Sequence, residues 1–389
     1  MRAAVSSGRL FAVALAAFVS LGLPDGVLGV AWPSMRQTFA LPVSQLGVLL
    51  AASTAGYLAS SFGSGPIVVR LGVGRLLLWS SVVMVVSLSI YALAPVWPVM
   101  VAGGVLAGLG AGAIDAGINA FAASSCSPQR TAWLHASYGV GAMLGPLVMT
   151  ATLVSGRSWR WGYASIGLAL AGMVVAFALT LPWWPRAVTA DAESGTLPRL
   201  FDTLRRPRVL LHVALFFLYT GLEATAGQWT YSLVTEARGV SPAIAGIWTA
   251  LFWGSLTFGR IVAAGLVRRA SVDTVLRAST LLAPLAAVLV WLDAGGLATM
   301  TGMIGLGLLF APVYPLLISA TPARLGAACA PHAIGAQVAA AYLGVAALPG
   351  AVGVLARAYG LEVVGPLLTV FALGLLGLHE FVLRARTAA

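Results

Sequence analysis

The chain alternates between long apolar runs and short polar segments. A helix of about twenty apolar residues crosses the roughly 30 Å hydrocarbon core of a bilayer. Twelve runs reach this length, near residues 10–32, 43–68, 75–94, 97–123, 131–154, 161–182, 209–234, 242–266, 274–292, 297–318, 333–356 and 361–383. The pattern therefore predicts an all-α membrane protein with twelve transmembrane helices.

A polar segment at 185–208 separates the first six runs from the last six. It predicts a six-helix bundle over 1–184, a cytoplasmic linker over 185–208 and a second six-helix bundle over 209–389. The halves also match at nearly constant offsets. Asp25 pairs with Glu223 at an offset of 198, and Gly141 pairs with Gly344 at 203. We expect two pseudo-symmetric bundles that arose from one duplicated unit.

Composition agrees with a membrane protein, because 60% of the residues are hydrophobic, only 8% are charged and the mean hydropathy is +0.96. Soluble domains carry about 25% charged residues. The sequence shows no phosphate-binding loop, nucleophile triad or metal-ligand cluster, and no segment large enough for a nucleotide-binding domain. We therefore expect neither an enzyme nor an ATP-driven pump, and we expect no cofactor and no metal.

The net charge of +11 follows from membrane topology rather than from binding to nucleic acid. With the N-terminus inside, seventeen of the 22 basic residues fall on the inner side and five on the outer side. Short cytoplasmic loops are enriched in arginine, so this bias places both termini and the linker in the cytoplasm. We expect a monomeric, multi-pass protein of the bacterial inner membrane, with the lipid bilayer as its surroundings.

Three acidic residues lie inside the runs and away from their ends: Asp25, Asp115 and Glu223. An ion inside a membrane span costs a few kcal/mol, so such residues usually face a cavity or a partner and often move protons. Asp25 is flanked by Pro24 and Gly26, which favour a broken helix. The alternative for Asp25 is a kinked helix in which the carboxylate caps a backbone amide.

The three acids are also candidates for solute binding, as are several polar residues that lie near them. Asn119 follows Asp115 by four residues and shares its helix face, although it can equally bridge two helices. Gln228 and Trp229 follow Glu223 and suit a polar, ring-shaped solute, but Trp229 can also be a residue of the aromatic belt. The weaker candidates, which can equally be structural, are His135, Gln337 and Tyr57.

The arrangement of the chain resembles the major facilitator superfamily. That family has twelve spans and a turn motif, G-x-x-x-D-R-x-G-R-R, after its second span. Residues 65–75 match this motif in part, with Val69 where the family has Asp. The resemblance implies rocking of the two bundles, with conformational gating by arginines at this turn and in the matching region of the second half: Arg70, Arg75, Arg260 and Arg268.

Within that superfamily, three segments look most like the fucose permease group of sugar–proton symporters. They are residues 25–33, 108–119 and 139–146, although Asp115 replaces the longer Glu of that group. The resemblance implies proton-coupled movement of a small polar, sugar-like solute across the membrane, with Asp25, Asp115 and Glu223 as the coupling acids.

Two other functions remain open at this point. A proton-driven exporter of drugs or metabolites is indicated by a partial antiporter signature, Gly141-x-x-x-Gly145-Pro146. A membrane receptor or scaffold without transport activity is the second alternative. It would be expected to carry a sizeable soluble domain or long loops.

Overall fold

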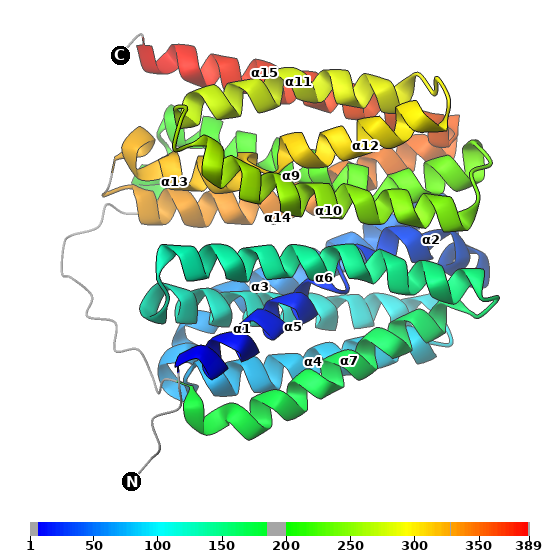
Figure 1. The fold of residues 1–389 in the computed structure, drawn as a ribbon, viewed down its shortest axis with the longest axis horizontal. Helices are drawn as coiled ribbons and strands as arrows, with labels where there is room; N and C mark the ends of the chain where they lie inside the picture. Colours follow the sequence, from blue (N-terminus) through cyan, green and yellow to red (C-terminus); the bar gives the residue numbers. More distant parts are fainter. Residues whose placement is uncertain (1–6, 185–199, 327, 388–389) are drawn as a thin grey trace. The chain divides into compact units, whose positions relative to one another are not determined.

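A computed structural model of the protein describes residues 7–184, 200–326 and 328–387. In these ranges every regular element is helical, and twelve helical segments are long and apolar enough to cross a membrane (Figure 1). The predicted fold class, an all-α protein with twelve spans, is confirmed.

The chain divides into two compact units, residues 1–41 with 48–192 and residues 42–47 with 193–389. The predicted boundary fell in the linker at 185–208. Residues 185–199 of that linker lie outside the described residues, and its remainder contains the short helix α8, Leu200–Leu204.

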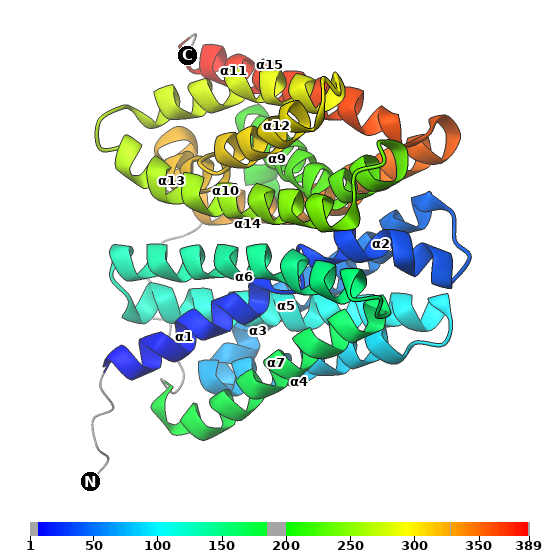
Figure 2. The same ribbon diagram turned by 45° about the vertical axis from the view of Figure 1, so that its right-hand side comes forward.

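Seven helices supply the spans of the first unit: α1 (Ser7–Gly22), α2 (Val27–Thr38), α3 (Leu46–Leu71), α4 (Val73–Leu93), α5 (Trp97–Ser125), α6 (Pro128–Val154) and α7 (Trp159–Thr180). A short 3-10 turn, η2 (Leu181–Trp183), follows α7, and another, η1 (Val43–Gln45), precedes α3. Within this unit α4 packs between α5 and α7, and α1 packs along α6 (Figures 1 and 2).

The spans of the second unit come from α9 (Pro207–Ser232), α10 (Pro242–Leu266), α11 (Val272–Trp291), α12 (Gly296–Phe310), α13 (Val313–Leu325), α14 (Ala330–Tyr359) and α15 (Val364–Thr387). A π-helical turn, η3 (Leu233–Ala237), extends α9, and a 3-10 turn, η4 (Leu361–Val363), precedes α15. Here α9 packs along α14, and α12 packs against α10 and α11 (Figure 2).

The first span is interrupted where the sequence favours a break. Helix α1 ends at Gly22 and α2 begins at Val27, and the four residues between them form turns with backbone bonds from Asp25 N to Gly22 O and from Val27 N to Pro24 O. Pro24 lacks an amide proton and cannot continue the hydrogen-bond ladder. Asp25 is therefore carried on a turn within the span.

The tenth span is interrupted as well, which the hydropathy pattern did not reveal. Its apolar run at 297–318 is divided between α12, which ends at Phe310, and α13, which begins at Val313. Pro312 lies between the two helices and cannot donate a backbone hydrogen bond. The break leaves the Phe310 carbonyl oxygen available to a side chain.

The duplication predicted from sequence offsets reappears in the closest helix contacts of each unit. A methyl group at Gly141 of α6 would lie 2.0 Å from the carbonyl oxygen of Val19 in α1. A methyl group at Gly344 of α14 would lie 2.1 Å from the carbonyl oxygen of Phe217 in α9. Gly344 follows Gly141 by 203 residues and Phe217 follows Val19 by 198, so the same contact occurs in both halves. Only glycine permits backbones to approach this closely.

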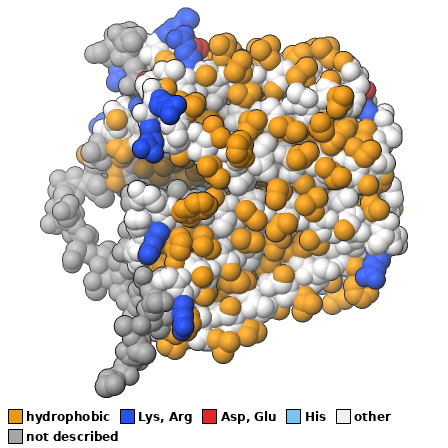
Figure 3. All heavy atoms as spheres, viewed as in Figure 1, with side chains coloured by type: hydrophobic (Ala, Val, Ile, Leu, Met, Phe, Trp, Pro, Cys, Tyr) orange, Lys and Arg blue, Asp and Glu red, His pale blue; other side chains and the backbone are white. Residues whose placement is uncertain are grey.

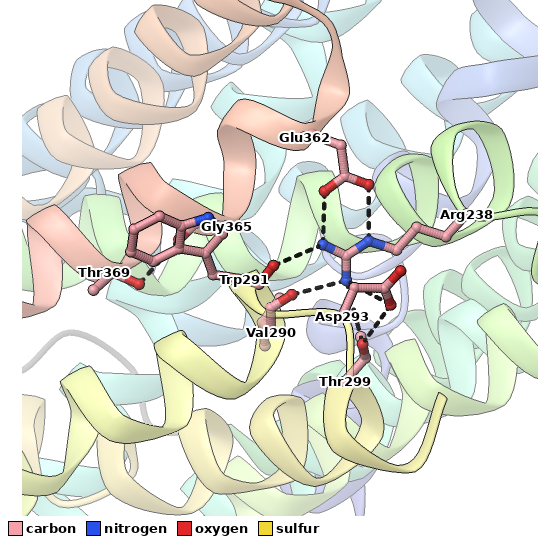
Figure 4. Close-up of polar contacts among 8 residues, drawn as sticks. All are labelled: Arg238, Val290, Trp291, Asp293, Thr299, Glu362, Gly365 and Thr369. Carbon is pink, nitrogen blue, oxygen red and sulfur yellow. Dashed lines mark hydrogen bonds and ion pairs between the residues drawn. The ribbon is translucent and has the colours of Figure 1, made fainter. Parts of the chain in front are cut away.

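An arginine also caps the C-terminus of one helix in each unit. Arg160 donates to the carbonyl oxygens of Ala92 (3.0 Å) and Ala94 (2.7 Å) at the end of α4. Arg238 donates to the carbonyl oxygens of Val290 (2.8 Å) and Trp291 (3.5 Å) at the end of α11 (Figure 4). The final carbonyls of a helix lack partners within the helix, and a cation there also complements the helix dipole.

Arg238 additionally joins three segments of the second unit. Its guanidinium forms a two-pronged pair with Glu362, at 2.9 and 2.7 Å, and a salt bridge to Asp293 at 3.4 Å (Figure 4). It also donates to the Thr299 hydroxyl at 3.2 Å. The Arg238 side chain is only 4% exposed, so this cluster ties η3, α12 and η4 together.

The outer faces of each unit suit a lipid environment. Large apolar side chains such as Leu168, Leu179, Phe258 and Leu285 are exposed on the helices. In the view of Figure 3 the side faces are apolar or neutral, and the arginine side chains gather towards the helix ends. This is the distribution expected for membrane-spanning helices.

Candidate functional site

Asp25 is held by a tyrosine from another helix. The Tyr138 hydroxyl of α6 donates a hydrogen bond to the Asp25 carboxylate. Close packing of α1 on α6 makes this possible, because a methyl group at Gly22 would lie only 2.1 Å from the Tyr138 carbonyl oxygen. The Asp25 side chain is exposed rather than sealed in the unit. An accessible acid on a broken helix can exchange a proton with its surroundings.

Asp115 lies on α5 in a network of three side chains. The Tyr57 hydroxyl of α3 donates to one carboxylate oxygen at 2.6 Å, and the Asn119 amide donates to the other at 3.0 Å. A methyl group at Gly112 would lie 2.6 Å from the Tyr57 carbonyl oxygen, so α3 and α5 are in close contact here. The structure thus brings together Tyr57, Asp115 and Asn119, three of the predicted site residues.

The two acids of the first unit also act on each other, because the negative charge of Asp115 repels that of Asp25. Two ionised carboxylates that act on each other raise each other's energy. Binding of a proton by one therefore makes ionisation of the other easier, and the proton belongs to the pair rather than to one residue.

In the second unit, Glu223 lies on the uninterrupted helix α9. The Tyr219 hydroxyl, one turn earlier on the same helix, contacts the Glu223 carboxylate and also lies 3.0 Å from the carbonyl oxygen of Phe310. A tyrosine hydroxyl has one proton and can donate it to only one acceptor at a time. The break between α12 and α13 thus supplies Tyr219 with an alternative acceptor.

Arg260 adds a positive charge to this site. It lies within the span formed by α10, two turns before that helix ends at Leu266, and it acts electrostatically on both Glu223 and Tyr219. The sequence assigned Arg260 to gating. It lies within the candidate membrane span Pro242–Leu266 and its charge acts on the Glu223 carboxylate, and its gating role stays a prediction.

The other predicted gating arginines lie at helix ends. Arg70 is in the last turn of α3, Arg75 is in the first turn of α4, and Arg268 follows α10, all with exposed side chains. These positions fit the ends of spans, and the gating role of these residues stays a prediction.

Four further candidates for solute binding have different surroundings. Trp229 is buried and donates its indole N–H to the Pro349 carbonyl oxygen at 2.9 Å. Gln337 is buried and accepts a hydrogen bond from the Thr321 hydroxyl at 3.1 Å. Gln228 is buried one turn beyond Glu223, and His135 is exposed and packs edge-on against Phe18. Their roles in binding stay predictions.

Sequence reasoning missed the tyrosine partners of two acids, Tyr138 and Tyr219. Tyr219 precedes Glu223 by four residues, and this spacing puts both on one helix face, so it could have been found. No local signal marked Tyr138, because it meets Asp25 only through the packing of α1 on α6.

Two helical units with ionisable side chains inside their spans are typical of secondary transporters. The sequence profile of the Major Facilitator Superfamily matches residues 11–349. The chain belongs to this superfamily, and the resemblance seen in the sequence is confirmed.

Two curated proteins are similar to most of the chain. "Bypass of stop codon protein 6" of Saccharomyces cerevisiae (strain ATCC 204508 / S288c) is 24% identical over 395 residues, covering 90% of this chain and 77% of that protein. "Uncharacterized transporter y4wD" of Sinorhizobium fredii (strain NBRC 101917 / NGR234) is 26% identical over 345 residues, covering 86% and 89%.

Solved structures show the same fold at low sequence identity. A D323A mutant of the nucleoside transporter NupG has a TM-score of 0.82 at 14% identity, covering 95% of this chain and 98% of that chain. A D-xylose-proton symporter has a TM-score of 0.73 at 16% identity, covering 94% and 96%. FucP in the outward conformation has a TM-score of 0.67 at 16% identity, covering 96% and 98%.

Proposed function

We propose that the protein is a proton-coupled secondary transporter that moves a small polar, sugar-like solute across the bacterial inner membrane by alternating access. One observation carries the proposal: Asp25 and Asp115 lie inside the spans of one unit, repel each other and accept hydrogen bonds from Tyr138 and Tyr57. Such an arrangement holds carboxylates that gain and lose protons during a transport cycle.

The hydrogen-bond donors explain how protonation can be linked to conformation. An ionised carboxylate accepts a strong hydrogen bond from its tyrosine, whereas a protonated carboxyl group accepts a weaker one. The Asp25 bond joins the turn after α1 to α6, and the Asp115 bond joins α5 to α3. Protonation therefore changes the contacts between helices of the first unit as well as their charge.

The names of two structural neighbours support this type of solute and coupling. One is a D-xylose-proton symporter, and another is described as the E. coli fucose:proton symporter. NupG is described as a nucleoside transporter, and nucleosides also carry a sugar ring. At 14–16% identity these names guide the choice of test solutes, while the acids of this chain carry the proposal.

The exporter alternative has weaker support. It depended on the spacing of Gly141 and Gly145 in α6, where methyl groups would lie 2.0 Å from the Val19 carbonyl oxygen and 2.1 Å from that of Leu23. Packing against α1 accounts for both glycines without an antiport function. We therefore propose solute uptake.

The proposal is tested in right-side-out membrane vesicles that contain the protein. Pulses of L-fucose, D-xylose, D-galactose, uridine and D-galacturonate are added to a weakly buffered suspension while external pH is recorded. At least one solute is expected to cause external alkalinisation, and the Asp25→Asn variant is expected to abolish it. Accumulation of a solute that a protonophore leaves unchanged would contradict proton coupling.

We further propose that both termini lie in the cytoplasm, as the arginine distribution indicates. Reporter fusions after residue 389 and within 185–208 are expected to be active only as cytoplasmic reporters. Activity of a periplasmic reporter at either position would overturn this topology.

A further inference from the structure

The strongest unexplained group in the molecule is the Arg260 guanidinium. It lies inside a span, where a charge without a counter-group is costly. Its neighbour Gly259 fixes α10 tightly on α12, since a methyl group there would lie 2.6 Å from the Ala311 side chain and 2.9 Å from the Leu308 carbonyl oxygen. The backbone at Arg260 is therefore firmly placed beside the break between α12 and α13.

Within the described part of the chain, Arg260 has no hydrogen-bond partner and no carboxylate within 4.0 Å, and its Nε is buried. Two arginines of the second unit whose side chains are almost fully buried are engaged. Arg238 pairs with Glu362 at 2.7 Å, and Arg324 pairs with Asp273 at 2.5 Å. The unit can thus neutralise a buried arginine with a direct salt bridge, and it does not do so at Arg260.

Glu223, the acid on which Arg260 acts, accepts its hydrogen bond from another residue. The Glu223 carboxylate contacts the Tyr219 hydroxyl, and Arg260 acts on it only electrostatically. A guanidinium offers five N–H donors in a planar fork that matches a carboxylate with two parallel hydrogen bonds. The donors of Arg260 therefore suit an acceptor from outside the protein.

We propose that Arg260 binds a carboxylate group of the transported solute, so that the substrate class is that of small hydroxylated organic acids such as sugar acids. This inference rests on the proposed transport function. It is more specific than a sugar-like solute, because the two parallel N–H donors of a guanidinium match a carboxylate better than they match the hydroxyl groups of a neutral sugar.

Glu223 makes this assignment compatible with a coupled proton. The groups that act on Glu223 among the described residues are Tyr219 and Arg260. A solute carboxylate on Arg260 would be repelled by an ionised Glu223, and one proton taken up by Glu223 removes that repulsion. One anion and one proton then enter the site together, and its net charge is unchanged.

The test measures binding to purified wild-type protein and to three variants: Arg260→Gln, Arg260→Lys and Arg269→Gln. Arg269 is an exposed arginine nine residues further along the chain and serves as the matched control. The probes are three carboxylates with their neutral counterparts: D-galacturonate with D-galactose, D-gluconate with D-sorbitol, and L-lactate with propane-1,2-diol. Dissociation constants come from calorimetry, and thermal shifts provide a second readout.

We expect wild type and Arg269→Gln to bind at least one carboxylate about tenfold or more tightly than its neutral counterpart, which is the scale of one charged hydrogen-bonded contact. Arg260→Gln is expected to abolish that preference. Arg260→Lys, which keeps the charge but loses the fork, is expected to retain part of it. If Arg260→Gln does not fold, the preference for the acidic probe is compared between Arg260→Lys and wild type. A preference in Arg260→Lys equal to that of wild type would then contradict the inference.

Three results would overturn the inference: equal affinity of wild type for the acidic and neutral probes, a preference that survives in Arg260→Gln, or no binding of any carboxylate. Proton-coupled uptake of a neutral sugar in the vesicle experiment would then leave the transport function standing. Loss of coupled uptake for every solute would instead remove the transport function itself.

Discussion

The two units hold their intramembrane acids in different ways. In the first unit Asp25 and Asp115 repel each other, and each receives a hydrogen bond from a tyrosine on another helix. In the second unit Glu223 is contacted by Tyr219 of its own helix, and the positive charge of Arg260 attracts the Glu223 carboxylate.

We infer from this contrast that the two halves, which share the same helix packing, have different roles. A pair of repelling acids is suited to binding a proton, because one proton relieves the repulsion. An acid beside an arginine with unused donors is suited to binding a charged solute group. The duplication preserved the helix packing, as the glycine contacts of α6 and α14 show, while the charges of the halves diverged.

The largest expected effect comes from removing the proposed proton site of the first unit. Asp25→Asn is expected to reduce the accumulation ratio of a transported solute to about 1, because a carrier without coupling only equilibrates its solute. Facilitated exchange should persist. The measurement compares uphill uptake with counterflow in proteoliposomes. Normal uphill uptake in Asp25→Asn would show that the carboxylate is structural.

Removing the tyrosine partners of the acids is expected to have an intermediate effect on transport. Among the residues that the structure describes, only Tyr219 donates a hydrogen bond to Glu223, and Tyr219→Phe removes it. Tyr57→Phe leaves Asp115 with its bond from Asn119. One bond to a charged group is worth about 1.5–3 kcal/mol, or roughly tenfold or more. We expect the initial rate of coupled transport to fall about tenfold in Tyr219→Phe and less in Tyr57→Phe. The reverse order would contradict this assignment of partners.

Arg160 and Arg238, which cap one helix in each unit, allow the stability of the two units to be compared while the acids are left unchanged. Arg238→Gln loses contacts with three side chains in addition to the two carbonyls at the helix end. We expect stability to fall by about 2–3 kcal/mol, less than for a fully buried pair because Glu362 and Asp293 are half exposed. Arg160→Gln loses two bonds to carbonyls, at about 1–2 kcal/mol. Thermal unfolding in detergent measures both, and equal losses would show that the extra contacts of Arg238 contribute nothing.

The smallest expected effect is a difference in stability between two neutralised acids. Asp115→Asn removes a repulsion from Asp25, whereas Glu223→Gln removes an attraction to Arg260. Each substitution also changes hydrogen bonds, so the charge effect is isolated by double-mutant cycles with Asp25→Asn and with Arg260→Gln. The coupling energy of Asp115 with Asp25 should be unfavourable and that of Glu223 with Arg260 favourable, each by about 1 kcal/mol. Differential scanning fluorimetry at pH 7.5 measures both coupling energies, and equal signs would contradict the contrast between the two units.

The sequence by itself determined the fold class and most of the plan of the chain. Hydrocarbon thickness requires runs of about twenty apolar residues, so length and hydropathy were sufficient to find twelve spans. The same physics singled out Asp25, Asp115 and Glu223, because placing an ionised acid in the hydrocarbon of a bilayer costs free energy. Helix geometry alone also placed Asn119 on the face of Asp115.

Only the tertiary structure decided which groups meet. Tyr138 reaches Asp25 from 113 residues away because glycines let α1 and α6 approach closely. The break at Pro312 exposes the Phe310 carbonyl to Tyr219, and helix packing lets the charge of Arg260 in α10 act on Glu223 in α9. Hydropathy records how apolar a segment is but not which way each side chain points. The chemistry of the site therefore depends on helix packing, which local sequence does not encode.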